Sequence, residues 1–271
     1  MFNFFKRRKK KEEAPVETLL HKELSFAATE AYKLLRINLL FSLPDNGKCR
    51  VVGITSSIRG EGKSTTSIHV SYALAMLGKK VLLLDADLRL PSVATKLGIP
   101  GEPGLSEMII KLDGKCNNIR EMPESENWHV LTSGSIPPNP SEMLGSPEMK
   151  GLVKELSEDY DFIIVDLPPV NIVSDALIVS EYLDGVIAVV RQDYSKRREV
   201  TKCVKQLELA GAKLLGFVMG GVSNSRRGYK KKSGYGYDGY HYGYGYGEYG
   251  RRRRDSESGV EPSEKSETKD A

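Results

Sequence analysis

The sequence is poor in the features that would place it outside a reducing, aqueous compartment. It has only three cysteines in 271 residues, Cys49, Cys116 and Cys203, and they lack the spacing of metal ligands. Widely separated thiols predict reduced cysteines rather than a disulfide framework. No apolar run approaches the roughly 18 residues of a membrane span. The basic start of the chain has no apolar stretch behind it, unlike a secretory signal. We therefore expect a cytoplasmic protein.

The chain also lacks a dominant charge. Its formal net charge is +4, so the overall balance favours no class of partner. The charges are unevenly placed instead. Bases run without a break from Lys6 to Lys11 and again from Arg251 to Arg254, and an acidic, serine-rich end follows. The first run stands behind Phe2, Phe4 and Phe5 and is typical of two things, attachment to an anionic membrane surface or a solvated charged end.

Hydrophobic patterning divides the chain into a basic lead segment (1–24), a domain (25–222) and a tail (223–271). Within the domain, short apolar strands alternate with helices. This predicts an α/β fold of the P-loop NTPase type, with a mostly parallel sheet covered by helices on both faces. The predicted strands are 51–55, 81–84, 128–132, 162–165, 185–190 and 214–218, and the predicted helices are 25–43, 63–77, 149–157, 175–182 and 196–209.

A glycine-rich turn typical of phosphate binding follows the first predicted strand. It differs from the pattern G-x-x-x-x-G-K-[ST] at one place, because Ser57 replaces the first glycine. Its glycines let backbone amides face phosphate at a helix N-terminus. Lys63 is expected to reach the β and γ phosphates, and Ser64 to bind magnesium. The turn therefore predicts an ATP and Mg²⁺ site built from Ser57, Arg59, Gly60, Glu61, Gly62, Lys63, Ser64 and Thr65. A turn that merely caps a helix is the alternative.

Acidic residues end two of the other predicted strands. Asp85 and Asp87 follow the strand 81–84, with Arg89 after them, and Asp166 follows the strand 162–165. In an open α/β sheet, ligands bind at the carboxyl ends of the strands. We therefore expect these acids to converge on the phosphate-binding turn. Taken singly, each would more often be a turn or helix-cap residue.

Together these segments resemble the bacterial protein-tyrosine kinases that control capsule and exopolysaccharide synthesis. The resemblance rests on the phosphate-binding turn, the segment Val81–Arg89, the segment Gly134–Leu144 and the segment Asp161–Pro169. It implies ATP-dependent autophosphorylation of tail tyrosines in trans. It assigns the catalytic base to Asp85 beside Lys63, and magnesium binding to Ser64, Asp87 and Asp166.

The resemblance also implies partners. These are other copies of the chain in a ring-like oligomer, a membrane polysaccharide co-polymerase and a cognate protein-tyrosine phosphatase, with the chain peripheral at the inner face of the membrane. Two departures stand out: Arg59 replaces a common proline, and the early helix carries Glu30, Lys33 and Arg36 where the family has Glu-x-x-Arg-x-x-Arg. Lysine keeps the charge of that subunit contact but loses the bidentate geometry of arginine.

The tail is the expected substrate. Tyr229–Gly250 has no aliphatic side chain, so it predicts disorder. A flexible segment can carry a hydroxyl into a shielded site. The expected phosphorylation sites are Tyr235, Tyr237, Tyr240, Tyr242, Tyr244, Tyr246 and Tyr249. Alternatives for the tail are a sticky segment without a covalent role and base stacking on nucleic acid, although no nucleic-acid partner is expected here.

Two rival functions share the nucleotide site. One is a partitioning or cell-division-site ATPase that switches with nucleotide and phosphorylates no protein. Such proteins usually carry a second lysine five residues before the P-loop lysine, where this chain has Ile58. The other is a regulatory scaffold that only binds nucleotide. The tyrosine-rich tail favours the kinase over both.

Overall fold

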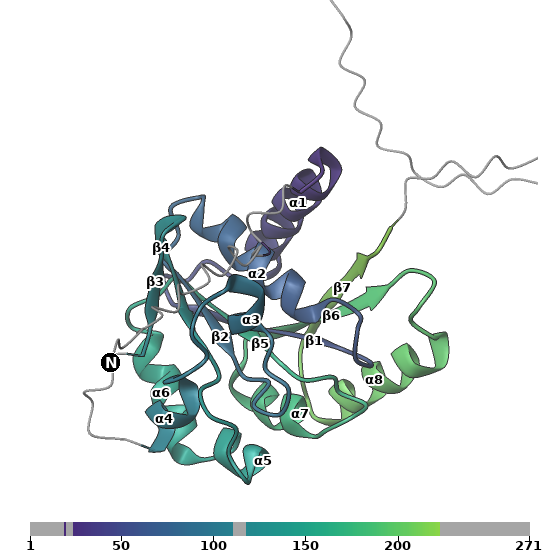
Figure 1. Cartoon of the computed structure of the whole chain (residues 1–271). Coiled ribbons are helices and arrows are strands. Elements are labelled where there is room, and N and C mark those ends of the chain that lie inside the picture. Colours follow the sequence, from purple (N-terminus) through teal and green to yellow (C-terminus); the bar gives the residue numbers. More distant parts are fainter. Residues whose placement is uncertain (1–18, 20–23, 111–117, 223–271) are drawn as a thin grey trace, which may run out of the picture. The chain divides into compact units, whose positions relative to one another are not determined.

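The computed structural model describes residues 19, 24–110 and 118–222 (Figure 1). The predictions made for the basic lead segment, for the tail and its tyrosines, and for Cys116 fall outside these residues. Every described residue belongs to the first of the two units into which the chain divides, Met1–Asn224.

A single seven-stranded sheet organises the domain, in the order β3-β4-β2-β5-β1-β6-β7. All neighbouring strands pair in parallel except β3 and β4, which are antiparallel. The predicted mostly parallel sheet is therefore confirmed. The strands are β1 (Arg50–Ser56), β2 (Val81–Asp85), β3 (Arg120–Met122), β4 (Ser125–Leu131), β5 (Phe162–Asp166), β6 (Gly185–Arg191) and β7 (Leu214–Gly220).

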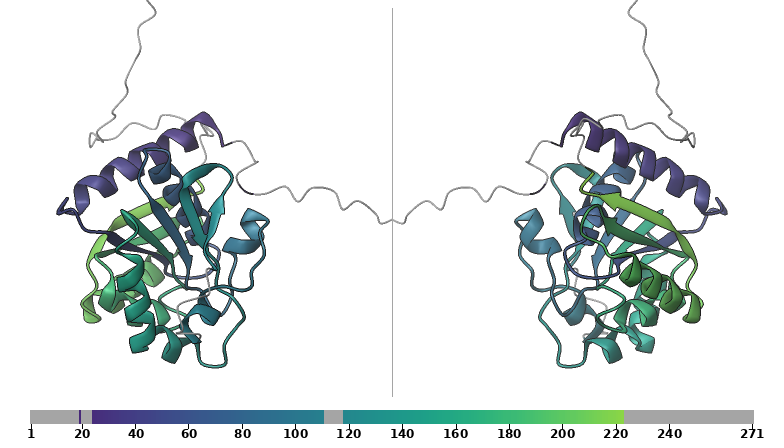
Figure 2. Two further views of the ribbon diagram at one scale, coloured as in Figure 1. Left: turned by 90° about the vertical axis from the view of Figure 1, so that its left-hand side faces the viewer. Right: turned by 90° about the vertical axis from the view of Figure 1, so that its right-hand side faces the viewer.

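Helices cover both faces of the sheet, as the sequence predicted. Figure 2 shows α1 on one side and α8 on the other. The helices are α1 (Phe26–Ser42), α2 (Lys63–Ala75), α3 (Val93–Leu97), α4 (Leu105–Ile110), α5 (Pro140–Leu144), α6 (Pro147–Leu156), α7 (Asp175–Val179) and α8 (Arg197–Leu209), with a 3₁₀ turn over Ser180–Tyr182. None of these helices is long and apolar enough to cross a bilayer.

The central strands are apolar throughout because both of their faces are buried. In β2, Leu82 and Leu84 pack with the helices α4 to α8, whereas Val81 and Leu83 pack with α1, α2 and α3. Alternation of side chains along a strand sends neighbours to opposite faces. The sheet therefore lies between two hydrophobic cores. These cores fix where each strand ends, and so they position the polar residues that follow the strands.

The helices α3, α4 and α5 and the strand β3 were not predicted. Each has three to six residues, which is too short for a helical or alternating pattern to stand out. Strand β4 begins three residues before its predicted start. Of these additions, β3 forms the edge of the sheet beside β4, and α3 contributes Lys96 to the cavity described below.

Candidate nucleotide-binding site

The phosphate loop runs from the end of β1 to the start of α2. Gly60 and Gly62 have φ angles of 82° and 99°, a region that favours glycine because it has no Cβ. Gly62 stands at the N-cap of α2, so the free amides and the positive end of that helix face the same space. A cavity of about 420 Å³ opens there, lined by the loop and by Asp87, Arg89 and Lys96 among others.

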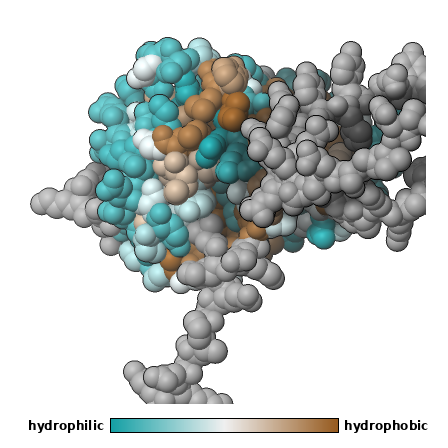
Figure 3. Space-filling view, turned by 90° about the horizontal axis from the view of Figure 1, so that it is seen from above, coloured by the Kyte–Doolittle hydropathy of each residue, from teal (hydrophilic) through white to brown (hydrophobic). Residues whose placement is uncertain are grey.

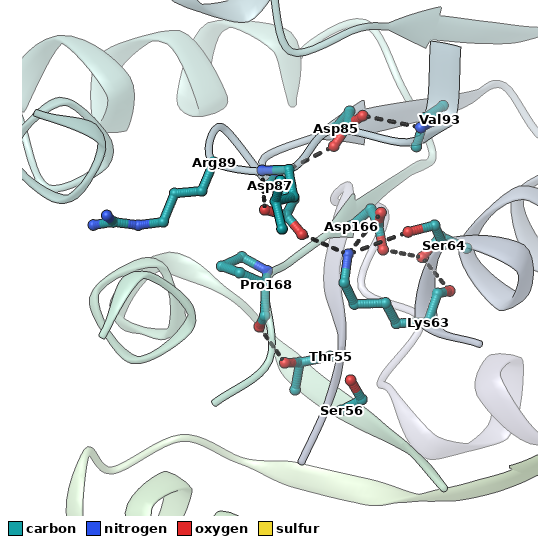
Figure 4. A network of polar contacts seen from close by, with 12 residues as sticks. Thr55, Ser56, Lys63, Ser64, Asp85, Asp87, Arg89, Val93, Asp166 and Pro168 are labelled. Carbon is teal, nitrogen blue, oxygen red and sulfur yellow. Dashed lines mark hydrogen bonds and ion pairs between the residues drawn. The ribbon is translucent and has the colours of Figure 1, made fainter. Parts of the chain in front are cut away.

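Lys63 lies between two carboxylates in this cavity (Figure 4). Its Nζ is 2.9 Å from Oδ2 of Asp87 and 3.3 Å from Oδ2 of Asp166, and it donates to Oγ of Ser64 at 3.2 Å. Asp85 and Asp166 are register partners on the neighbouring strands β2 and β5. The structure therefore brings together the lysine, the hydroxyl and the three acids that the sequence singled out.

The three acids do not occupy equivalent positions. Asp87 lines the cavity, whereas Asp85 and Asp166 are fully buried. Asp85 accepts backbone N–H bonds from Asp87 and Val93, both at 3.2 Å. Asp166 accepts from the Ser67 hydroxyl at 3.0 Å. Asp85, which the resemblance makes the catalytic base, thus lies behind Asp87 as seen from the cavity.

Burial gives this cluster unusual protonation. Desolvation, reinforced by the neighbouring Asp166, raises the pKa of Asp85 to about 8. Desolvation likewise raises the pKa of Asp166, against the opposing effect of Lys63. For Lys63, burial disfavours the charged form, but attraction to Asp166 and Asp87 outweighs it and raises the pKa. Lys63 is therefore held in its charged form, and its single ammonium supplies less positive charge than the three acids around it could bind.

The donor chemistry of this cluster fits magnesium. Mg²⁺ prefers oxygen ligands and is commonly held by one or two carboxylates together with substrate phosphates and water. Ser64, Asp87 and Asp166 supply such oxygens, and the Lys63 ammonium shows that the space between the two acids accommodates a cation. Among the described residues, no group of three His, Cys, Asp or Glu side chains forms a metal site by itself. The fit is that of an ion shared with a nucleotide.

Two predicted binding residues turn away from the cavity. Ser57 and Glu61 are 2% and 1% exposed. The Glu61 carboxylate accepts from Oγ of Ser57 at 2.9 and 3.0 Å and from the Ile58 amide at 2.9 Å, and Ser195 also donates to it. These side chains brace the loop from within, and neither residue lines the cavity.

Sequence reasoning missed a second brace, the segment Arg191–Ser195, which begins at the last residue of β6. Arg191 donates to the Gly60 carbonyl at 3.2 Å, and the Tyr194 hydroxyl donates to the Arg59 carbonyl at 3.0 Å. The Ser195 hydroxyl completes the set through Glu61. We call this segment the strap. Its five residues are polar and match no motif. The strap is recognised only by its contacts with phosphate-loop residues that lie 131 or more positions away in the sequence.

An ion pair at the rim of the cavity was also missed. Arg89 binds the fully buried Asp175 through two hydrogen bonds of 2.8 and 3.2 Å, and Ser141 donates to Asp175 at 2.6 Å. The pair joins the loop after β2 to α5 and α7. It fixes the direction of Arg89, so the guanidinium is largely committed to its own chain.

The residues predicted for subunit contact lie on α1. Lys33 pairs with Glu30 at 2.7 Å, and Arg36 donates to the Ala73 carbonyl of α2 at 2.9 Å, so all three bind within the chain. Figure 3 views this side and shows brown, apolar patches among polar residues. Apolar side chains of α1 exposed to solvent include Phe26 at 81%, Leu34 at 59% and Phe41 at 86%.

Comparison with known proteins agrees with this geometry. A family profile described as an AAA domain matches residues 49–213. The tyrosine-protein kinase YwqD of Bacillus subtilis is 38% identical over 211 residues, covering 78% of this chain and 86% of that protein. The kinase domain of the Escherichia coli tyrosine kinase ETK superposes with a TM-score of 0.70 at 29% identity, covering 87% of this chain and 89% of that one.

This chain belongs to the bacterial tyrosine-protein kinase family. A more distant structural likeness is to the septum site-determining protein MinD of Pyrococcus horikoshii, solved with Mg-ADP, at a TM-score of 0.53 and 27% identity over 63% of this chain and 70% of that one. The shared core is that of a P-loop ATPase. The higher similarity to the kinases agrees with the absence of a lysine at position 58.

Proposed function

We propose that the protein is an ATP-dependent protein-tyrosine autokinase that phosphorylates its own tyrosine-rich tail in trans and thereby regulates capsular or exopolysaccharide synthesis and export. The observation that carries the proposal is the cluster of Lys63, Asp87 and Asp166 on the phosphate loop, in a chain that belongs to the tyrosine-kinase family. The same cluster supports ATP with Mg²⁺ as the cosubstrate.

Phosphate binding would rearrange this cluster. The Lys63 ammonium, now shared by two carboxylates, turns to the β and γ phosphates, and the loop amides hold their oxygens. Ser64, Asp87 and Asp166 would hold Mg²⁺, which would supply positive charge to the transferred phosphoryl group. Asp85 and Asp166 are fully buried, and burial strengthens the electrostatic contacts made on that side of the site.

Transfer to tyrosine needs a proton acceptor. The phenol oxygen attacks the γ phosphorus, the bond to the β–γ bridging oxygen breaks, and the phenol proton goes to a carboxylate. We assign that role to Asp85. Its raised pKa suits a group that accepts a proton near neutral pH. Asp87 is the rival base, because it lies on the cavity surface.

The alternative is a nucleotide switch of the partitioning or cell-division type, without transfer to protein. The likeness to MinD supports the common ATPase core of both functions. Ile58 and the tail from Tyr229 to Gly250 favour the kinase. Phosphotyrosine on the purified chain separates the two.

The assembly proposed with this activity is a ring-like homo-oligomer at the inner face of the membrane. It would be activated by the cytoplasmic segment of a polysaccharide co-polymerase and reset by a protein-tyrosine phosphatase. Each tail phosphate adds about −1.5 to −2 charges at pH 7. Several of them would repel the acids of a neighbouring site, so we expect phosphorylation to dissociate the ring.

A single set of proteins tests these proposals. The full chain and a variant with every tail tyrosine from Tyr229 to Tyr249 changed to phenylalanine are purified and incubated with ATP and Mg²⁺. We expect phosphotyrosine on the tail of the first, and larger particles by light scattering before phosphorylation than after it. A tail free of phosphotyrosine would contradict the autokinase. Equal particle sizes would contradict only the switch.

A further inference from the structure

Tyr194, the fourth residue of the strap, packs against the phosphate loop. Its hydroxyl donates to the Arg59 carbonyl at 3.0 Å, and its ring covers Gly60 so closely that a Cβ there would meet the hydroxyl oxygen at 3.0 Å. The Arg191 guanidinium lies 5.4 Å from the ring centre, within cation–π range. The tyrosine thus holds the outer turn of the loop in place.

Despite this role, Tyr194 is open to solvent. It is 47% exposed, and the residues from Arg191 to Tyr194 are exposed with it. Asp193 before it has a φ of 58°, a left-handed conformation that ordinary residues seldom adopt, although aspartate tolerates it better than most. The other described tyrosines, Tyr32, Tyr72, Tyr160 and Tyr182, are buried or half-buried. Of the tyrosines outside the tail, Tyr194 is the one that a second copy could reach.

We propose that Tyr194 is a regulatory phosphorylation site, modified by the kinase activity of a second copy, and that its phosphate releases the strap and weakens nucleotide binding. The inference rests on the proposed autokinase function. In the reaction, the Tyr194 oxygen takes the γ-phosphoryl group of ATP, ADP leaves, and the phenol proton passes to the carboxylate base of the acting copy.

The contact with Arg59 explains why a phosphate would act as a switch. A phosphorylated tyrosine has no hydroxyl proton to donate, so its oxygens would face the Arg59 carbonyl oxygen as acceptor against acceptor. The added charge of about −1.5 to −2 would also lie beside Arg59, Gly60 and Arg191, which line the cavity expected to take a polyanionic nucleotide. Both effects drive the ring off Gly60, and the loop then loses one of its outer braces.

Exposed basic residues next to Tyr194 would bind its phosphate once the strap has left the loop. Lys196, Arg197 and Arg198 follow Tyr194 at the start of α8, and all three are exposed. No described acid is within ion-pair distance of them. Bases at a helix start are unfavourable in the helix dipole, so this run has no structural benefit of its own. Pairing with a phosphotyrosine two to four residues away would stabilise the released strap.

The first test asks whether the modification occurs. Wild-type protein is incubated with ATP and Mg²⁺ and digested with trypsin, which cuts after Arg191 and Lys196 and frees the peptide 192–196. We expect this peptide to gain one phosphate, and to gain none in Tyr194→Phe, which keeps Ser195. To show that transfer is in trans, a Lys63→Met chain that cannot bind ATP serves as acceptor for active Tyr194→Phe chains.

The second test asks what the phosphate does. Full-length protein carrying phosphotyrosine at position 194, introduced during translation, is compared with Tyr194→Phe and wild type. We expect the Kd for ATP to rise tenfold or more with phosphotyrosine, but less than about threefold with phenylalanine, which keeps the ring and loses one hydrogen bond. An unchanged Kd for the phosphotyrosine protein overturns the switch.

The outcomes separate this inference from the function on which it rests. Phosphorylated tail peptides with an unmodified peptide 192–196 would overturn the regulatory site and leave the autokinase standing. Complete absence of phosphotyrosine would overturn both. Phosphate on the Lys63→Met acceptor at Tyr194, supplied by the active chains, together with weakened ATP binding of the phosphotyrosine protein, supports the inference in full.

Discussion

In the phosphate loop, the buried carboxylate of Glu61 accepts hydrogen bonds from Ser57, Ile58 and Ser195. In the cluster at the ends of β2 and β5, the single ammonium of Lys63 is shared by Asp87 and Asp166, with the buried Asp85 beside them. The loop is therefore braced by its own side chains before any ligand arrives. The cluster is short of positive charge, which a metal ion and nucleotide would supply. A braced loop suited to phosphate and a cluster of acids suited to a cation therefore lie next to each other.

Removing the shared ammonium should have the largest effect. We expect Lys63→Met to abolish both ATP binding and tail phosphorylation, because the lost phosphate stabilisation amounts to several kcal/mol, as for other charged transition-state contacts. Titration calorimetry with Mg-ATP and a phosphotyrosine immunoblot measure the two. Lys202→Met, on the exposed surface of α8, is the control and should behave like wild type. Unchanged phosphotyrosine in Lys63→Met would contradict the site.

Replacing the buried acid tests the division of roles within the cluster. We expect Asp85→Asn to retain Mg-ATP binding and to lose about 10²- to 10⁴-fold in phosphoryl transfer, the usual cost of removing a general base. Asp87→Asn is the matched variant, and it should weaken Mg-ATP binding itself. Single-turnover transfer and equilibrium binding separate these effects. The reverse pattern would assign the base to Asp87 and metal binding to Asp85.

The cluster should also make nucleotide-free stability depend on pH. The folded pKa of Asp85 is raised to about 8 by burial and by Asp166, against about 3.9 in an unfolded chain. The folded state therefore binds the proton more tightly, and the free energy of unfolding falls as pH rises from about 4 to about 8. Urea unfolding of wild type and Asp85→Asn should give curves that diverge across this window. Parallel curves would contradict the shift.

The sequence predicts the cluster of acids around Lys63 but not the contacts that hold the phosphate loop. Lys63, Asp85, Asp87 and Asp166 stand at strand ends or in a motif, and parallel strands bring their carboxyl ends to one edge, so their convergence follows from the pattern. The strap and the pairing of Arg89 with Asp175 depend on contacts between segments far apart in sequence. Neither has a motif or a periodicity, and only the packed structure contains them.

Ser57 offers the smallest expected effect and the finest test of the loop. The motif has glycine at this position, but the backbone of Ser57 does not enter the left-handed region, so glycine is not required here. The side chain instead donates to both oxygens of Glu61, which keeps its bonds from Ile58 and Ser195 if Ser57 is lost.

Restoring the motif with Ser57→Gly should therefore lower the free energy of unfolding rather than improve binding. We expect a loss of about 0.5–1.5 kcal/mol from the hydrogen bond, and about 0.4–1 kcal/mol more than in Ser57→Ala because glycine gives the unfolded chain greater freedom. The Kd for ATP should stay within about threefold of wild type in both variants, since Gly60, Gly62 and the strap still shape the loop. A tenfold gain in affinity with glycine would mean that Ser57 holds the loop away from the shape that binds ATP. The loop would then not be preorganised, and it would no longer differ in this respect from the cluster of acids around Lys63.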